Sequence, residues 1–204
     1  MTRPVLIPLP VPAATTARAT RARRAALVAV ASLVLCTPLA AAPRDCTEFA
    51  RGARALVGTA GVSHDPGIGS VAVSNLGVEW QVRDCLGAFV GLNTGYDMPR
   101  RQPDGWQVGP AAGLRWQWRT GPGWSVYLDG QAAPVRHQHA LSEHSLRFNF
   151  DLQGGAGASR ALTPDTRLLG GLRWHHLSNA RVRGQDRNLG YDGALLYGGL
   201  ARRF

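Results

Sequence analysis

Residues 106–119 read WQVGPAAGLRWQWR, and two kinds of side chain alternate along this stretch. The even-numbered positions are apolar, whereas the odd-numbered positions are polar or small. A period of two is typical of a β-strand, because successive side chains point to opposite faces. The alternation lasts about a dozen residues, which is long for a strand of a soluble domain and matches a tilted strand that crosses a membrane.

The same alternation recurs in residues 124–131 and 146–153, and less regular segments bring the number of predicted strands to eight. Short connections such as residues 121–123 alternate with longer polar ones such as residues 134–145 and 179–189. An even number of strands with short turns at one end and long loops at the other is typical of outer-membrane barrels. The sequence therefore predicts an all-β fold, an eight-stranded antiparallel transmembrane β-barrel of the outer-membrane type. The predicted strands cover residues 54–63, 70–83, 86–97, 106–119, 123–133, 146–159, 167–178 and 190–204.

A soluble eight-stranded barrel of the lipocalin type is the alternative fold, and its apolar face would point inward. In this chain, arginine, asparagine, aspartate and glutamine occupy the second face of several predicted strands. That distribution suits a small polar lumen and an apolar wall that faces lipid. Aromatic residues near the strand ends also resemble the girdles found at membrane interfaces.

The N-terminus has the features of a secretory signal peptide. Four arginines precede an apolar run at residues 25–35, which is too short to span a bilayer, and small residues follow at 40–42. Because Pro43 disfavours cleavage directly before it, we expect cleavage after Ala41 and export to the outer membrane of a Gram-negative cell. The predicted domains are a cleaved signal peptide at residues 1–41 and a single barrel domain at residues 42–204.

Two other interpretations of the N-terminus fit less well. Lipid attachment at Cys36 is disfavoured because the bulky Leu35 stands where a small residue is needed. A retained membrane anchor is disfavoured by the shortness of the apolar run.

The charge of the chain partly reflects this targeting segment. Loss of residues 1–41 removes five arginines and no acids, which lowers the formal net charge from +10 to about +5. The remaining arginines are scattered among apolar residues and form no basic stripe, so the sequence predicts no nucleic acid partner.

Two details agree with the predicted topology. Cys46 lies just before the first predicted strand and Cys85 lies in the turn after the second, so both fall on the periplasmic side and form a candidate disulfide. The chain ends in Phe204, as expected of the terminal strand that the barrel-assembly machinery reads during insertion.

Three residues near the C-terminus form a candidate catalytic triad. His176, Ser178 and Asp192 have the same parity on the last two predicted strands, so they share one face of a hairpin. A hydroxyl, an imidazole and a carboxylate within reach of one another make serine a nucleophile at neutral pH. The phase of the neighbouring leucines places this face toward lipid, where polar ionisable groups are costly without a function.

Residues 174–180 (WHHLSNA) and 188–192 (NLGYD), followed by a terminal aromatic strand, resemble the lipid A 3-O-deacylase (PagL) family. The resemblance is specific over about residues 170–204 and architectural over the remainder. It implies an eight-stranded outer-membrane barrel with an active site on its lipid-facing exterior. It also implies hydrolysis of the ester-linked acyl chain at the 3-position of lipid A in lipopolysaccharide.

The resemblance further implies a role for each member of the triad. Ser178 would be the nucleophile, His176 the general base and then the general acid, and Asp192 the orienting carboxylate. Two positions depart from the family pattern, which has glutamate in place of Asp192 and proline in place of Leu189. This chemistry needs no metal and no cofactor.

The loop between the last two predicted strands supplies the remaining candidate residues. The proposed oxyanion donors are Asn179 together with Asn188 or Gly190, and the candidates for pairing with lipid phosphates are Arg181, Arg183 and Arg187.

Two other functions fit the same barrel. One is a non-enzymatic small outer-membrane protein, structural or adhesive, of the OmpX type. The other is an outer-membrane phospholipase or general esterase.

Overall fold

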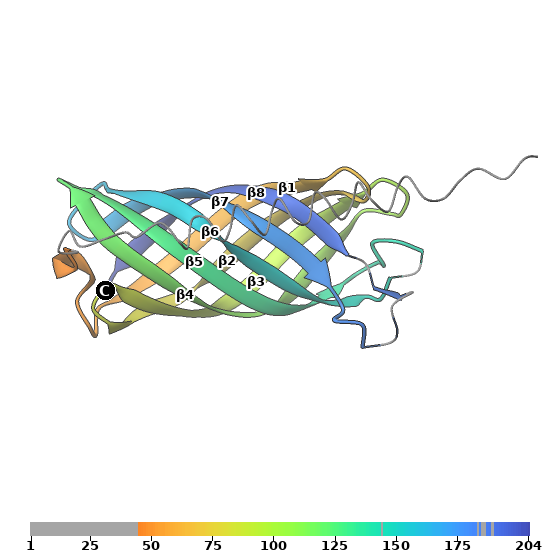
Figure 1. Ribbon diagram of the computed structural model, residues 1–204, viewed down its shortest axis with the longest axis horizontal. Coiled ribbons are helices and arrows are strands. Elements are labelled where there is room, and N and C mark those ends of the chain that lie inside the picture. Colours follow the sequence, from red (N-terminus) through yellow and green to blue (C-terminus); the bar gives the residue numbers. More distant parts are fainter. Residues whose placement is uncertain (1–44, 144, 183, 185–186, 189) are drawn as a thin grey trace, which may run out of the picture. The chain divides into compact units, whose positions relative to one another are not determined.

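The computed structural model describes residues 45–143, 145–182, 184, 187–188 and 190–204. They form a closed barrel in which eight antiparallel strands follow one another in sequence order around the wall (Figure 1). Each predicted strand overlaps one of these eight, so the predicted fold is confirmed. No helix within the described ranges is long and apolar enough to cross a membrane. The strands are β1 (Arg54–Asp65), β2 (Gly69–Arg83), β3 (Leu86–Pro99), β4 (Gly105–Gly121), β5 (Trp124–His137), β6 (Phe148–Ala161), β7 (Thr166–Ser178) and β8 (Tyr191–Arg203).

The predicted signal peptide at residues 1–41, and with it the alternative at Cys36, lies outside the described residues.

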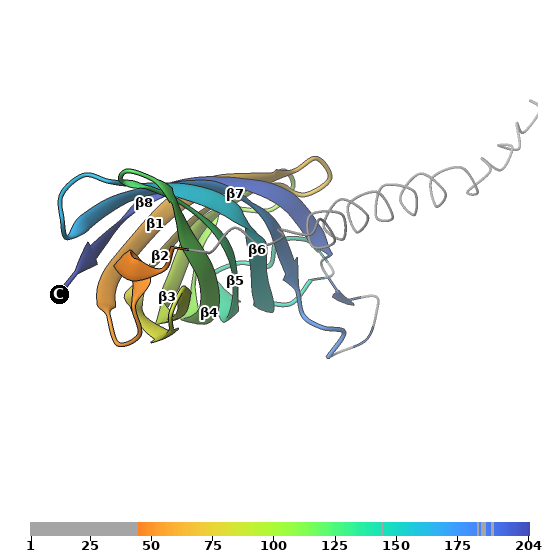
Figure 2. The ribbon, with the colours of Figure 1, turned by 60° about the vertical axis from the view of Figure 1, so that its left-hand side comes forward.

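The first and last strands close the barrel. β8 pairs with β1 in an antiparallel register that runs from Ala55↔Arg203 to His64↔Ala194. Figure 2 shows these two strands side by side, with the other six completing the wall. Closure leaves no sheet edge with unpaired backbone groups, which is the condition for strands to be stable in lipid.

The two faces of the wall differ in polarity, as the alternation in β4 illustrates. Trp106, Leu114 and Trp116 are exposed on the outside, whereas Arg115 and Gln117 are buried inside. The apolar wall therefore faces outward, as in a membrane barrel and opposite to a lipocalin-type barrel.

The centre of the lumen holds a network of four charged side chains. Arg115 contacts Glu79 (Nη1 to Oε2, 2.7 Å) and Asp129 (Nη2 to Oδ2, 3.1 Å). Arg173 contacts the same oxygen of Asp129 at 2.6 Å. The four charges balance, so each buried ion has an opposite partner, which such burial requires.

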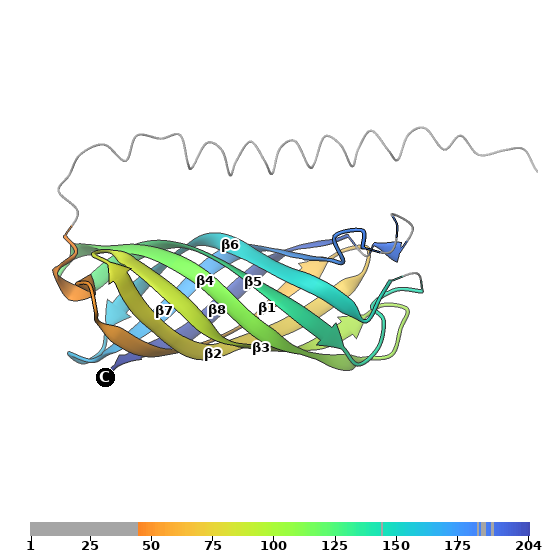
Figure 3. The ribbon, with the colours of Figure 1, turned by 90° about the horizontal axis from the view of Figure 1, so that it is seen from below.

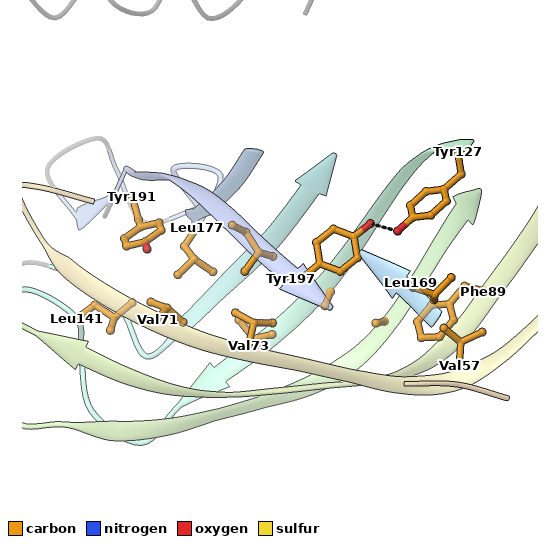
Figure 4. Packing of buried hydrophobic residues seen from close by; sticks show 14 residues of the cluster. Val57, Val71, Val73, Phe89, Tyr127, Leu141, Leu169, Leu177, Tyr191 and Tyr197 are labelled. Atoms are coloured by element: carbon orange, nitrogen blue, oxygen red, sulfur yellow. Dashed lines mark hydrogen bonds between the residues drawn. The ribbon is translucent and has the colours of Figure 1, made fainter. Parts of the chain in front are cut away.

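Buried aromatic and aliphatic side chains form a second cluster (Figure 4). Tyr197 donates a hydrogen bond of 2.9 Å to Tyr127 across the lumen. One hollow beside Arg115 and Asp129 measures about 20 Å³, and another beside Glu48 and Arg167 measures about 40 Å³. Such volumes hold water and are too small for an acyl chain.

One end of the barrel carries residues 45–53, the N-terminal segment of the described chain, together with the C-terminus, and the loop from β7 to β8 lies at the opposite end (Figure 3). A disulfide joins Cys46, next to the short 3-10 helix η1 (Thr47–Phe49), to Cys85 in the β2–β3 turn. Arg167 of β7 contacts Glu48 of η1 at 2.5 Å. These links hold the N-terminal segment against the barrel, far along the wall from the β7–β8 loop.

Candidate active site

The centre of the candidate site is a histidine and a carboxylate on adjacent strands. His176 of β7 and Asp192 of β8 are direct cross-strand partners. The two side chains meet at 2.9 Å between His176 Nδ1 and Asp192 Oδ1. A carboxylate at Nδ1 orients the ring and leaves Nε2 as the nitrogen that accepts a proton.

The alternation of β7 decides where this pair lies. Leu168, Leu172 and Trp174 have the same parity as His176 and are exposed on the outer wall. Arg173 and His175 have the opposite parity and are buried in the lumen. The His176–Asp192 pair therefore lies on the outer, apolar surface of the barrel, at the end opposite to η1 and the C-terminus.

Ser178 is the last residue of β7 and has the same parity as His176. Its Cα lies about 7 Å further along the strand, the repeat of two residues in a β-strand. Ser178 is 8% exposed and stands opposite Phe150 of β6. In the described part of the chain no hydrogen bond joins Ser178 to His176. The structure thus brings two of the three candidate residues into contact and places the third next to them, a geometry that commonly tightens when substrate binds.

The loop after Ser178 is organised by the buried side chain of Asn179. The backbone N–H of Asn179 donates to Asn188 Oδ1 (3.0 Å), and its side-chain amide donates to the carbonyl of Arg187. Asn179 Oδ1 accepts a hydrogen bond of 2.9 Å from the backbone N–H of Arg181. Two of the predicted oxyanion donors, Asn179 and Asn188, therefore contact each other, and Asn179 ties the two arms of the loop together.

The other predicted residues of this loop are arranged as follows. Gly190 has a positive φ of 65° directly before β8, a conformation that glycine adopts without strain. Arg181 and Arg187 are exposed on the loop. Arg183 lies outside the described residues.

Two contacts to Asp192 were missed by the sequence reasoning. Trp174 Nε1 donates to Asp192 Oδ1 at 3.1 Å, and the backbone N–H of Asp192 donates to Asp65 Oδ2 at 3.0 Å. The parity of Trp174, two residues before His176, was a signal that could have identified the first contact. The second depends on the pairing of β8 with β1, for which the local sequence has no signal.

A second serine, histidine and aspartate lie inside the barrel, behind the external pair. Ser63 Oγ contacts His175 Nδ1 at 2.7 Å and the hydroxyl of Tyr191 at 2.6 Å, and His175 Nε2 lies 3.2 Å from Asp151 Oδ1. All four residues are almost fully buried in the lumen. This network is closed to lipid and joins β1, β6, β7 and β8 behind the external site.

Within the described residues, no three His, Cys, Asp or Glu side chains are grouped to hold a metal ion.

Comparison with known proteins bears on the fold and on the family of the chain. The barrel resembles Neisserial surface protein A, with a TM-score of 0.55 and 17% identity over 75% of this chain and 97% of that one. It also matches the N-terminal barrel domain of Pseudomonas aeruginosa OprF, with a TM-score of 0.47 and 13% identity over 76% of this chain and 100% of that one. A search of the curated proteins found no match. The sequence model described as lipid A 3-O-deacylase (PagL) matches residues 87–200, which is more than half of the chain. The chain therefore belongs to the lipid A 3-O-deacylase (PagL) family.

Proposed function

We propose that this protein is a lipid A deacylase that hydrolyses the ester-linked 3-O acyl chain of lipopolysaccharide in the outer leaflet of the outer membrane. The observation that carries the proposal is the His176–Asp192 pair, 2.9 Å apart on the outer wall of the barrel. An ionisable pair on a surface that faces lipid is costly unless it has a function there. Membership of the family supplies the substrate class.

In the proposed mechanism, Ser178 Oγ attacks the carbonyl carbon of the ester while His176 Nε2 removes the hydroxyl proton. Asp192 keeps Nδ1 of the ring protonated and stabilises the imidazolium that forms. The bond between the acyl carbonyl carbon and the ester oxygen then breaks, the oxygen stays on the sugar as the 3-hydroxyl, and His176 transfers its proton to it. Water, deprotonated by His176, hydrolyses the acyl–Ser178 ester and releases the fatty acid.

N–H groups of the loop at residues 179–190 would stabilise the oxyanion formed in both steps. The candidates remain Asn179 with Asn188 or Gly190. The backbone N–H and the side-chain amide of Asn179 already donate within the loop, so binding of substrate would have to redirect one of them, whereas Asn188 takes part in its contact with Asn179 as an acceptor.

The outer wall beside the pair suits an acyl chain. Leu172 and Leu196 are direct partners across β7 and β8, and both are more than half exposed. A second leucine pair, Leu168 and Leu200, continues the stripe toward the other end of the barrel. An acyl chain lying along this stripe would carry its ester to the level of Ser178.

The headgroup of the substrate would then lie beside the β7–β8 loop. Arg181, Arg183 and Arg187 are the proposed partners of the lipid phosphates, because guanidinium groups form paired, charge-assisted hydrogen bonds to phosphate oxygens. We assign export to the signal peptide at residues 1–41 and membrane insertion to the barrel-assembly machinery as part of the same proposal.

Mass spectrometry of lipid A tests the proposal. Lipid A from cells that express the protein should be lighter by one hydroxylated acyl chain than lipid A from cells that express Ser178→Ala. The same loss should occur when the purified barrel acts on lipid A in detergent. The absence of a mass difference in both settings would rule out the deacylase.

The same samples separate the two alternatives. Cleavage of phospholipids with intact lipid A would identify a phospholipase or general esterase. Intact lipid A and intact phospholipids would identify a non-enzymatic barrel.

A further inference from the structure

The carboxylate of Asp192 has a second donor besides the imidazole. Trp174 Nε1 and His176 Nδ1 both donate to Asp192 Oδ1, at 3.1 and 2.9 Å. The indole also stacks on the imidazole, with ring centroids 5.1 Å apart and an angle of 15° between the planes. Trp174 therefore touches both members of the pair.

The chemistry of an indole suits this position. A carboxylate on a lipid-facing wall has few water molecules to solvate it, so each protein donor stabilises its charged form more than it would in water. The indole N–H is a donor only, and it keeps its proton throughout the reaction. Its bond to Asp192 is therefore independent of the proton that His176 accepts and returns.

The stacking contact restricts the imidazole in a second way. An indole plane lying against one face of the ring limits rotation of the His176 side chain about its χ2 bond. The bond to Oδ1 meanwhile limits rotation of the Asp192 carboxylate. Both restrictions preserve the alignment that proton transfer requires.

We propose that Trp174 is a positioning residue that holds Asp192 and His176 in the catalytic arrangement, in addition to any contact with the acyl chain. The inference rests on the proposed function, because it assigns a role within the same site. It concerns the N–H group of the indole and is separate from the apolar area of the ring.

The variant Trp174→Phe tests this role, because it keeps an aromatic ring on the wall and removes the N–H. We expect kcat for release of fatty acid from lipid A to fall about tenfold, the effect of losing one hydrogen bond to a charged group. KM should stay within about twofold, since the apolar surface is retained. Trp106→Phe is the matched control, because Trp106 is another exposed tryptophan of the outer wall, on β4, and should leave both constants unchanged.

Three results would overturn the proposal. The first is an unchanged kcat in Trp174→Phe, and the second is a raised KM with unchanged kcat, which would make Trp174 an acyl-chain contact only. The third is a loss of folded barrel, measured by circular dichroism, that accounts for the whole fall in activity.

A double variant and a second assay sharpen the result. In an Asp192→Ala background, Trp174→Phe should not lower further the rate at which a fluorophosphonate labels Ser178, because its acceptor is absent. A further tenfold fall in that background would contradict action through Asp192. If the unsubstituted protein neither deacylates lipid A nor is labelled at Ser178, the proposed function itself fails. Normal activity that is insensitive to Trp174→Phe would instead contradict this inference alone.

Discussion

His176 and Asp192 are direct partners in the β7–β8 ladder, and their side chains meet at 2.9 Å on the outer wall of the barrel. Directly opposite residues in an antiparallel pair have Cβ atoms about 5 Å apart. At that separation the short side chain of aspartate reaches the imidazole. This geometry allows aspartate to serve as the proposed orienting carboxylate.

Substitution of Asp192 tests its proposed role as the orienting carboxylate. Asp192→Asn should lower kcat for deacylation by on the order of 10³–10⁴-fold, because the amide no longer stabilises the imidazolium. Asp192→Glu should retain more activity than Asp192→Asn, since it keeps the charge and adds one methylene. Release of fatty acid by the purified barrel measures both. Equal activity of Asp192→Asn and the unsubstituted protein would exclude Asp192 from the triad.

Ser178→Ala and His176→Ala should each abolish deacylation to the level set by binding and oxyanion contacts, a loss of at least about 10³-fold. The temperature of unfolding should change little, because neither side chain belongs to the ion-pair network of the lumen. A second histidine and serine on the outer wall are the matched control. His64 of β1 and Ser70 of β2 are in contact, with 2.9 Å between His64 Nδ1 and Ser70 Oγ. His64→Ala and Ser70→Ala should leave activity intact. Loss of activity in these controls would show that the catalytic site lies at His64 and Ser70 and not at His176 and Ser178.

Arg115→Met should destabilise the barrel without touching the outer site. The substitution leaves Glu79 without its partner at 2.7 Å and Asp129 with Arg173 alone. An uncompensated buried charge of this kind costs about 3–5 kcal/mol of unfolding free energy. Denaturant titration in detergent or lipid vesicles measures the loss, with the exposed Arg136→Gln of the outer wall as control. A decrease below about 1 kcal/mol would show that the lumen rearranges or admits water around the free charges.

Removal of the disulfide should lower the free energy of unfolding and leave the catalytic activity unchanged. Cys46 and Cys85 are 39 residues apart in sequence, and a cross-link over a loop of this length stabilises a fold by about 4 kcal/mol in the chain-entropy model. The double variant Cys46→Ala/Cys85→Ala should lose stability of this order in denaturant titration and keep its kcat, because the bond lies at the opposite end of the barrel from His176. A parallel loss of kcat in fully folded protein would reveal coupling between the two ends.

Much of the fold was predictable, because the alternation of apolar and polar residues within each strand indicates which side chains face outward. The alternation within β4 alone separates Trp106, Leu114 and Trp116 on the outside from Arg115 and Gln117 inside. The predicted strand boundaries were less accurate. The predicted strand at residues 123–133 corresponds to β5, which extends to His137. The longer strand follows from pairing with its neighbours, which continues after the apolar pattern has ended.

The sequence by itself determined the barrel, its apolar outer wall and the shared face of His176 and Ser178, because a period of two assigns each side chain to a face without reference to other strands. Only the tertiary structure decided that Asp192 stands directly opposite His176, that the Trp174 N–H joins them, and that Glu79, Arg115, Asp129 and Arg173 meet in the lumen. These contacts depend on the register between strands and on the closure of β8 against β1. The energy that sets both is distributed over the whole ladder and lumen, and no single segment of the chain contains it.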